Sequence, residues 1–200
     1  HWSADALTEE LRQPGTVAYI LTNSRSLPPE EARALNTEIA RHLSTASEAT
    51  GREISIVSRS DSTLRGHYAV ETETLISATG LPVDGILVVP FFLEGGRYTI
   101  DDTHYVDEGG WLTPAADTEY ARDPVFGYTS SNLRQWVAER SGLARAEEVA
   151  SISLADLRTG GPRRVELCLS KLENAHPCVV NAASYRDLEV LVAGLLASEA

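Results

Sequence analysis

Three short apolar runs, each followed by a polar stretch and then a helical pattern, are the feature that most constrains the fold of this chain. They occupy residues 17–21, 54–57 and 86–89, and two similar runs follow at 149–154 and 178–181. Short apolar runs rich in β-branched residues are typical of buried strands, and their alternation with helices is typical of βαβ units. We therefore predict an α/β fold, with a mostly parallel sheet and helices on both faces.

Helical patterns separate these runs, and the middle of the chain changes character. Residues 28–51 begin with two prolines and two acids and carry an apolar residue every three or four positions, which is typical of a helix with one buried face. Residues 97–110 alternate instead and end in two glycines, which predicts a β-hairpin-like insertion. Further helices are expected after residue 67 and at 129–141, 163–174 and 185–198.

The charge balance narrows the range of partners. The chain has 17 Lys and Arg residues against 29 Asp and Glu, a net charge of −12, which disfavours nonspecific binding to nucleic acid or to an anionic membrane. Its longest apolar run, 86–93, is less than half of a membrane span and contains Pro90. The N-terminus does not have the basic-then-apolar order of a signal peptide. We therefore expect a cytoplasmic protein with neither nucleic acid nor membrane as a partner.

The residue inventory also argues against several kinds of enzyme. The chain begins at His1 and contains no Met, so we expect it to be a piece of a longer protein. Its one lysine, Lys171, lies in no glycine-rich phosphate loop, so any nucleotide should bind outside this chain. The Gly-x-Ser-x-Gly and Gly-x-Gly-x-x-Gly patterns do not occur, which disfavours a hydrolase and a dinucleotide-dependent oxidoreductase.

Polar stretches directly follow the first three predicted strands, at residues 22–26, 58–66 and 94–97. Ligands of parallel sheets bind beyond the carboxyl ends of the strands, so these three stretches are expected to converge on one edge of the sheet. The arginines that they contain are Arg25, Arg59, Arg65 and Arg97.

Arginines and hydroxyls together indicate a small hydroxylated acid as the ligand. A guanidinium binds a carboxylate through two parallel hydrogen bonds, and hydroxyl side chains suit a polyol. The candidate substrate-binding residues are Arg25, Arg59, Ser60, Asp61, Ser62 and Arg65. Two alternatives stay open: that these are solvated loop residues, and that Arg65 pairs with an internal acid such as Glu71.

Two questions of chemistry have only partial answers in the sequence. Asp61 is a candidate for accepting the hydroxyl proton of a substrate, but no catalytic base is assigned. The acids of the stretch 101–104 (DDTH) could suggest a metal site. Two acids in a turn are usually solvated, so no metal is expected there.

Three motifs resemble those of the four-carbon acid sugar kinase family. They are SRSDSTLRGH at 58–67 followed by Glu71, GGRYTIDDTHYV at 95–106, and ARDPVFGYTSSNLRQWV at 121–137. The resemblance runs from about residue 22 to residue 196. It implies a two-domain kinase that uses ATP and Mg²⁺, in which an N-terminal α/β domain binds threonate, erythronate or a 3-oxo-tetronate. A C-terminal domain would bind the nucleotide, and phosphate would go to the 4-hydroxyl.

The chain departs from that family pattern in several places. The family's opening Asp-Asp-x-Thr-Gly motif and its C-terminal nucleotide domain are missing, the usual Lys before the DSTLRG motif is Arg59, and the usual Asn after it is His67. The resemblance thus implies that residues 1–200 are a single substrate-binding domain, truncated at both ends, that holds no cofactor and is inactive alone. A non-catalytic acid-sugar-binding or sensor module is the alternative.

Overall fold

The structure of the chain is a computed structural model that describes residues 2–15, 17–143 and 145–198. It divides into two compact units. The first comprises His1–Ser60 and Gly66–Pro82, and the second comprises Asp61–Arg65 and Val83–Ala200. The interpretation of residues 1–200 as a single domain stays a prediction.

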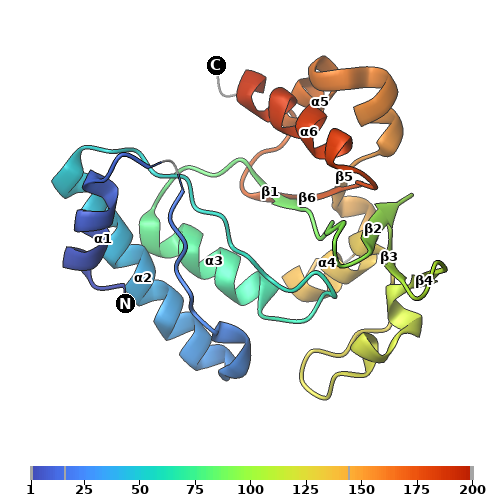
Figure 1. The fold of residues 1–200 in the computed structure, drawn as a ribbon, viewed down its shortest axis with the longest axis horizontal. Helices are drawn as coiled ribbons and strands as arrows, with labels where there is room; N and C mark the ends of the chain where they lie inside the picture. Colours follow the sequence, from blue (N-terminus) through green and yellow to red (C-terminus); the bar gives the residue numbers. More distant parts are fainter. Residues whose placement is uncertain (1, 16, 144, 199–200) are drawn as a thin grey trace. The chain divides into compact units, whose positions relative to one another are not determined.

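The first unit is helical. Its helices are α1 (Ala4–Arg12), α2 (Pro29–Thr50) and α3 (Tyr68–Thr79), and a short 3₁₀ turn, η1 (Ser24–Ser26), precedes α2 (Figure 1). The helix α2 packs against both α1 and α3. It begins at a proline, which lacks the N–H that a first helical turn leaves unpaired, and ends before Gly51 in the left-handed conformation, as the sequence predicts.

Two of the predicted strands do not form in this unit. Residues 17–21 and 54–57 have no regular secondary structure and pair with none of the strands that the structure describes. The side chains of Val17, Leu21 and Val57 are 70%, 86% and 80% exposed. An apolar run becomes a buried strand only where a neighbouring strand pairs with it and another layer covers it. Residues 17–21 and 54–57 meet neither condition, so the prediction of strands here was wrong. Both conditions depend on parts of the chain that are distant in sequence, and a local pattern does not reveal them.

A parallel sheet lies at the centre of the second unit and confirms the predicted α/β class. Its strands are β1 (Gly85–Val88), β5 (Ala150–Ile152) and β6 (His176–Val180), arranged in the order β1-β6-β5. Both strand pairs are parallel. All three strands fall on apolar runs that the sequence marks as strands.

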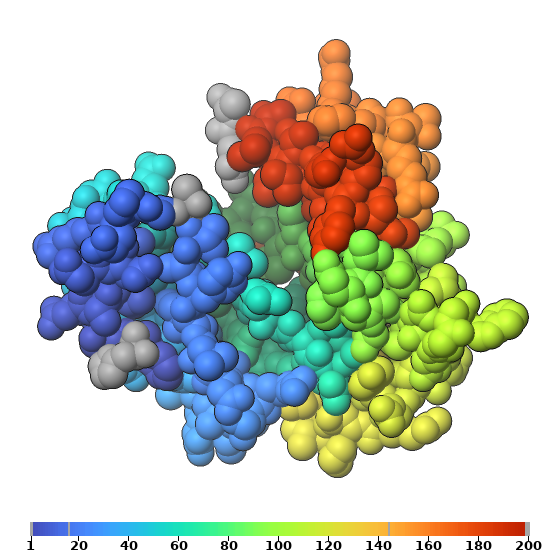
Figure 2. Space-filling view, viewed as in Figure 1, coloured from blue at the N-terminus to red at the C-terminus, as the bar shows by residue number. Residues whose placement is uncertain are grey.

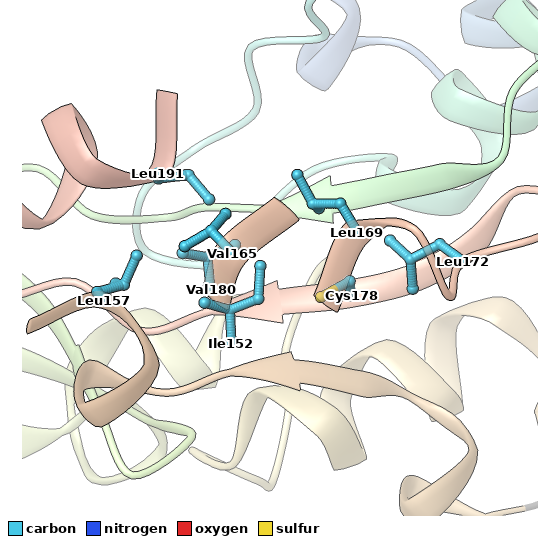
Figure 3. Packing of buried hydrophobic residues seen from close by; sticks show 8 residues of the cluster. All are labelled: Ile152, Leu157, Val165, Leu169, Leu172, Cys178, Val180 and Leu191. Carbon is cyan, nitrogen blue, oxygen red and sulfur yellow. The ribbon is translucent and has the colours of Figure 1, made fainter. Parts of the chain in front are cut away.

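The hydrophobic core of this unit is formed between the sheet and two helices, α5 (Gly161–Leu169) and α6 (Tyr185–Ser198). Its members, shown in Figure 3, are Ile152, Leu157, Val165, Leu169, Leu172, Cys178, Val180 and Leu191. Side chains alternate along a strand, so the buried Val179 points to the opposite face. The helix α4 (Leu133–Ser141) also packs against β6. Helices therefore contact the sheet from both faces.

The predicted hairpin is confirmed as a small antiparallel sheet. It contains β2 (Arg97–Ile100), β3 (Thr103–Asp107) and β4 (Leu112–Pro114), in that order. The turn between β2 and β3 places Asp101 and Asp102 at φ values of 50° and 60°, the left-handed conformation of a two-residue hairpin turn. The short turns of this unit are η2 (Ala115–Asp117), η3 (Glu119–Arg122), η4 (Ala146–Glu148) and the π-helical η5 (Asp156–Gly160).

The helix α6, red in Figure 2, carries several exposed apolar side chains. Its side chains Tyr185, Val192 and Leu196 are 47%, 49% and 63% exposed, whereas Leu191 is buried in the core. No helix in the described part of the chain is both long enough and apolar enough to span a membrane.

An ion pair between a buried aspartate and a half-exposed arginine connects the start of α6 to the turn before α5. Both oxygens of Asp187, a residue 2% exposed, accept hydrogen bonds from Arg158, over 2.8 and 2.9 Å. The same carboxylate accepts hydrogen bonds from the Ala183 N–H and the Ser184 hydroxyl. The Arg158 hydrogen bonds, aided by these other donors, lower the pKa of Asp187 to about 2.

We predict that Asp187→Asn lowers the free energy of unfolding by about 1–2 kcal/mol at neutral pH. The ionised carboxylate stabilises the fold above its unfolded pKa of 3.8, and this contribution is lost as the pH falls through about 2. Urea unfolding from pH 7 to pH 2 measures it. Glu189→Gln is the control, because Glu189 pairs with Arg186 on the exposed face of the same helix, and such pairs contribute little. Equal effects of the two substitutions would contradict the prediction.

Candidate functional site

The segment Asp61–Arg65 (DSTLR) packs within the second unit and is built around one carboxylate. Asp61 accepts hydrogen bonds from the Thr63 hydroxyl and from Arg65 Nε, the latter over 2.8 Å. Burial alone would raise the pKa of Asp61, but these hydrogen bonds and the charge of Arg65 lower it below its usual value. Asp61 is therefore ionised at neutral pH and is a weak proton acceptor.

Two buried side chains from elsewhere in the unit hold the backbone of this segment. His104, on β3, bonds the carbonyl of Ser62 over 2.7 Å through Nε2, and Tyr128 donates its hydroxyl to the carbonyl of Thr63 over 2.9 Å. The next residue, Leu64, is buried at a φ of 65°. A branched residue in this left-handed conformation costs about 1–2 kcal/mol. The two hydrogen bonds therefore stabilise a backbone geometry that the segment would not favour by itself.

His104 is neutral and has a defined tautomer. Because a carbonyl only accepts, Nε2 carries the proton that bonds Ser62, and Nδ1 accepts from the Thr99 hydroxyl over 3.0 Å. Burial, together with the charge of Arg97, lowers the pKa of His104 to about 4. Both ring nitrogens are thus engaged in supporting the site.

The guanidinium of Arg65 contacts carboxylates and an aromatic ring in addition to Thr63. Its Nε bonds Asp61, its NH1 lies 3.7 Å from Asp123 Oδ2, and its central carbon lies 5.0 Å from the centre of the Tyr120 ring. The central carbon of Arg97 lies 5.2 Å from the same ring. Two cations therefore lie against one aromatic ring, and two carboxylates pair with one of these cations.

A second cluster forms in the first unit around Glu71, a buried residue in the first turn of α3. Its carboxylate accepts hydrogen bonds from the Ser24 hydroxyl over 2.5 Å and from the Ser58 hydroxyl over 3.2 Å. Glu71 thus brings together the two polar stretches that follow residues 17–21 and 54–57, although neither run is a strand.

Gly66 lies nearby in sequence at a φ of +135°, where the Cβ of any other residue would come within 2.7 Å of Ser60 Oγ.

The structure brings only some of the predicted residues together. Arg65 and Arg97 meet at Tyr120, as their expected convergence requires, and the carboxylates that pair with Arg65 are Asp61 and Asp123. The predicted residues Arg25, Arg59 and Ser60 belong to the first unit, whereas Asp61, Ser62 and Arg65 belong to the second. The meeting of all six at one site stays a prediction.

Of the two acids of the hairpin turn, Asp101 is exposed, as expected, whereas Asp102 is held in a hydrogen-bond network. Asp102 Oδ1 accepts hydrogen bonds from Ser151 and from Asn181, over 2.5 and 2.8 Å, and the Asn181 side chain in turn accepts from the Asp102 N–H. Among the described residues, no group of three His, Cys, Asp or Glu side chains is arranged to hold a metal ion. The network instead connects the hairpin turn to the parallel sheet.

Sequence reasoning missed Tyr120, Asp123 and Tyr128 as parts of this cluster. All three lie in or next to the motif at 121–137, which the resemblance includes, but no pattern within that motif distinguishes them. Their contacts with the Asp61–Arg65 segment span more than fifty residues of sequence. Only the folded structure shows these contacts.

The second unit is thus an α/β domain with a polar cluster around Arg65 and Tyr120. A family profile described as a sugar-binding N-terminal domain matches residues 3–200. The chain belongs to this family.

Comparison with individual proteins agrees. The chain is 30% identical over 184 residues to a D-erythronate kinase of Heliobacterium modesticaldum (strain ATCC 51547 / Ice1), an alignment that covers 89% of this chain and 38% of that protein. A crystal structure of a Salmonella typhimurium LT2 protein, provisionally assigned as a tRNA synthase, matches with a TM-score of 0.67. That match has 20% identity and covers 94% of this chain and 48% of the other, so it shows the fold alone. The chain spans less than half the length of either protein.

We predict that the stability of this protein falls as the pH drops from about 6.5 to about 4, because of His104. The unfolded chain binds a proton at the ordinary histidine pKa of 6.5, whereas the folded protein resists it until about pH 4. The stabilisation is complete above pH 6.5, and about 2–3 kcal/mol is lost across this interval. Urea unfolding of the wild type and of His104→Gln at several pH values measures it. The same slope in both proteins would contradict this assignment.

Proposed function

We propose that this chain binds the acid-sugar substrate of an ATP-dependent kinase that phosphorylates the terminal 4-hydroxyl of a four-carbon acid, such as erythronate, threonate or 3-oxo-tetronate. The observation that carries the proposal is Arg65. Its side chain is 24% exposed and its guanidinium is held at Nε by Asp61 and Thr63. The similarity to a protein named D-erythronate kinase supports the choice of a sugar acid.

The chemistry of the substrate indicates what this chain contributes. Phosphoryl transfer depends mainly on positioning and on neutralising charge. A four-carbon sugar acid has its carboxylate at C1 and the reacting hydroxyl at C4, so binding the carboxylate at Arg65 presents the opposite end of the molecule for phosphorylation. In this proposal Ser60, Asp61 and Ser62 bind substrate hydroxyls, and Arg25 and Arg59 are further anchors.

Two carboxylates already face Arg65, which limits how a third can bind. Asp61 bonds Nε over 2.8 Å, whereas Asp123 lies 3.7 Å from NH1, beyond ordinary hydrogen-bond distance. The substrate would therefore displace or share the weaker contact with Asp123. The nearby charge of Arg97 offsets part of the repulsion between these acids and the substrate.

ATP and Mg²⁺ are assigned in this proposal to a C-terminal domain of the full-length protein. The residues of this chain do not fit them well: Lys171 is its only lysine, and the described residues offer no metal-binding group of acids and histidines. We accordingly propose that the chain alone is inactive and that the full-length protein works in the cytoplasm. The contribution of this chain is to bind and orient the acid.

The full-length protein tests the proposal directly. We expect ATP-dependent formation of a 4-phosphorylated product from at least one of erythronate, threonate and 3-oxo-tetronate, detected by ³¹P NMR. Binding of an acid without phosphorylation would favour the alternative, a non-catalytic acid-sugar-binding or sensor module. Absence of binding to all three acids would overturn both.

We predict that Arg65→Lys weakens acid-sugar binding by the full-length protein by roughly 1–3 kcal/mol, about 5- to 150-fold, because the charge is kept but the two-pronged hydrogen bonding is lost. ATP affinity should change little. Isothermal titration calorimetry measures both. The control is Arg145→Lys, because Arg145 is exposed and pairs with Glu148. A lower melting temperature with unchanged acid affinity would show that Arg65 supports the fold through Asp61 and Asp123 instead.

A further inference from the structure

Tyr120 lies against both guanidiniums of the cluster, those of Arg65 and Arg97. It lies in the short turn η3, and its ring centre is 5.0 Å from the central carbon of Arg65 and 5.2 Å from that of Arg97. Distances below about 6 Å allow the negative face of an aromatic ring to attract a cation. A further contact of this kind places the central carbon of Arg140 6.0 Å from the centre of the Trp136 ring.

The ring of Tyr120 is itself held in place by Arg97. The NH2 of Arg97 donates a hydrogen bond to the Tyr120 hydroxyl over 3.3 Å, and its NH1 donates to the carbonyl of Gly95. Arg97 is the first residue of β2, so the antiparallel sheet anchors it. Both terminal nitrogens of Arg97 therefore bond the protein itself, and its buried Nε has no hydrogen-bond partner among the described residues. Arg97 thus suits a supporting role better than direct contact with a ligand.

Arg65, unlike Arg97, is proposed to contact the substrate directly, so part of its guanidinium has to be able to bind a ligand. Its Nε is engaged by Asp61 and Thr63, so a substrate carboxylate is assigned to the terminal NH1–NH2 edge of the fork. That edge rotates about the last bonds of a long side chain, and Asp123, 3.7 Å from NH1, competes with a substrate for it. A flat ring against the guanidinium restricts this rotation without using any of its hydrogen-bond donors.

We propose that Tyr120 is a positioning residue for substrate binding: it holds the Arg65 guanidinium in the orientation that accepts a carboxylate, and Arg97 fixes the ring that does so. This inference rests on the proposed function of Arg65. Without the ring, Arg65 spends less time in the competent orientation, and the apparent affinity falls in proportion to that fraction.

The experiment compares variants of the full-length protein by calorimetry with erythronate and by steady-state kinetics. We expect Tyr120→Leu to weaken erythronate binding about 3- to 10-fold and to raise KM by a similar factor, with kcat at saturating substrate unchanged. In an Arg65→Lys background the same substitution should add little, because it acts through Arg65. Tyr98→Leu is the matched control: Tyr98 is half-buried on β2 and packs edge-to-face with Phe91, so its loss should lower the melting temperature only.

A second pair of variants keeps the shape of the site and guards against misfolding. Tyr120→Phe retains the ring, and a trifluorophenylalanine at the same position retains its size but removes most of its negative face. We expect weaker erythronate binding for the fluorinated ring than for phenylalanine, whereas a merely structural role would give equal affinities.

The outcomes separate this inference from the function on which it rests. If the wild type binds none of the three sugar acids, the proposed function fails. If the wild type binds but Tyr120→Leu binds equally well, or if the fluorinated and unfluorinated rings give the same affinity, the positioning role of Tyr120 is overturned. Equal effects of Tyr120→Leu in the wild-type and Arg65→Lys backgrounds would likewise overturn it, because Tyr120 would then act independently of Arg65.

Discussion

The hydrogen bonds that His104 and Tyr128 make to two consecutive carbonyl groups are the support on which the candidate site depends. They hold the carbonyl groups of Ser62 and Thr63, the two residues that directly precede Leu64 in its left-handed conformation. Without them the chain would relax toward a conformation that costs less, and Arg65 would lose its fixed starting point. Because both donors are buried in the second unit, the position of the guanidinium follows from the packing of that unit.

The parts of the fold that could be predicted from the sequence are those whose structure is marked by the local pattern of residues. The strands β1, β5 and β6 and the hairpin were predicted because apolar runs and turn residues of the right length mark them, and the structure supplies their partners. The runs at 17–21 and 54–57 have the same local pattern but find no partner among the described strands. Pairing is a property of two segments, and no single run reveals it.

The site was predictable to a similar extent. Arg65 could be singled out because a short polar motif that ends in glycine surrounds it, and Arg97 because it follows a predicted strand. Tyr120 could not be, because its role arises from packing against side chains distant in sequence. Of the two acids that pair with Arg65, one is local and one is distant in sequence. Asp61 is four residues away, whereas Asp123 is contributed by another part of the second unit.

The buried carboxylate of Glu71 has a consequence for how this sequence can diverge. It receives hydrogen bonds from hydroxyls on two separate loops, at Ser24 and Ser58, and a buried acid that loses such donors costs more than the hydrogen bonds themselves contribute. Replacement of Ser24 or Ser58 is therefore expected to destabilise the fold least when Glu71 is replaced as well. Across diverging relatives, the three positions should covary as a unit, and the length of the loop that contains Ser24 should be restricted by the same geometry.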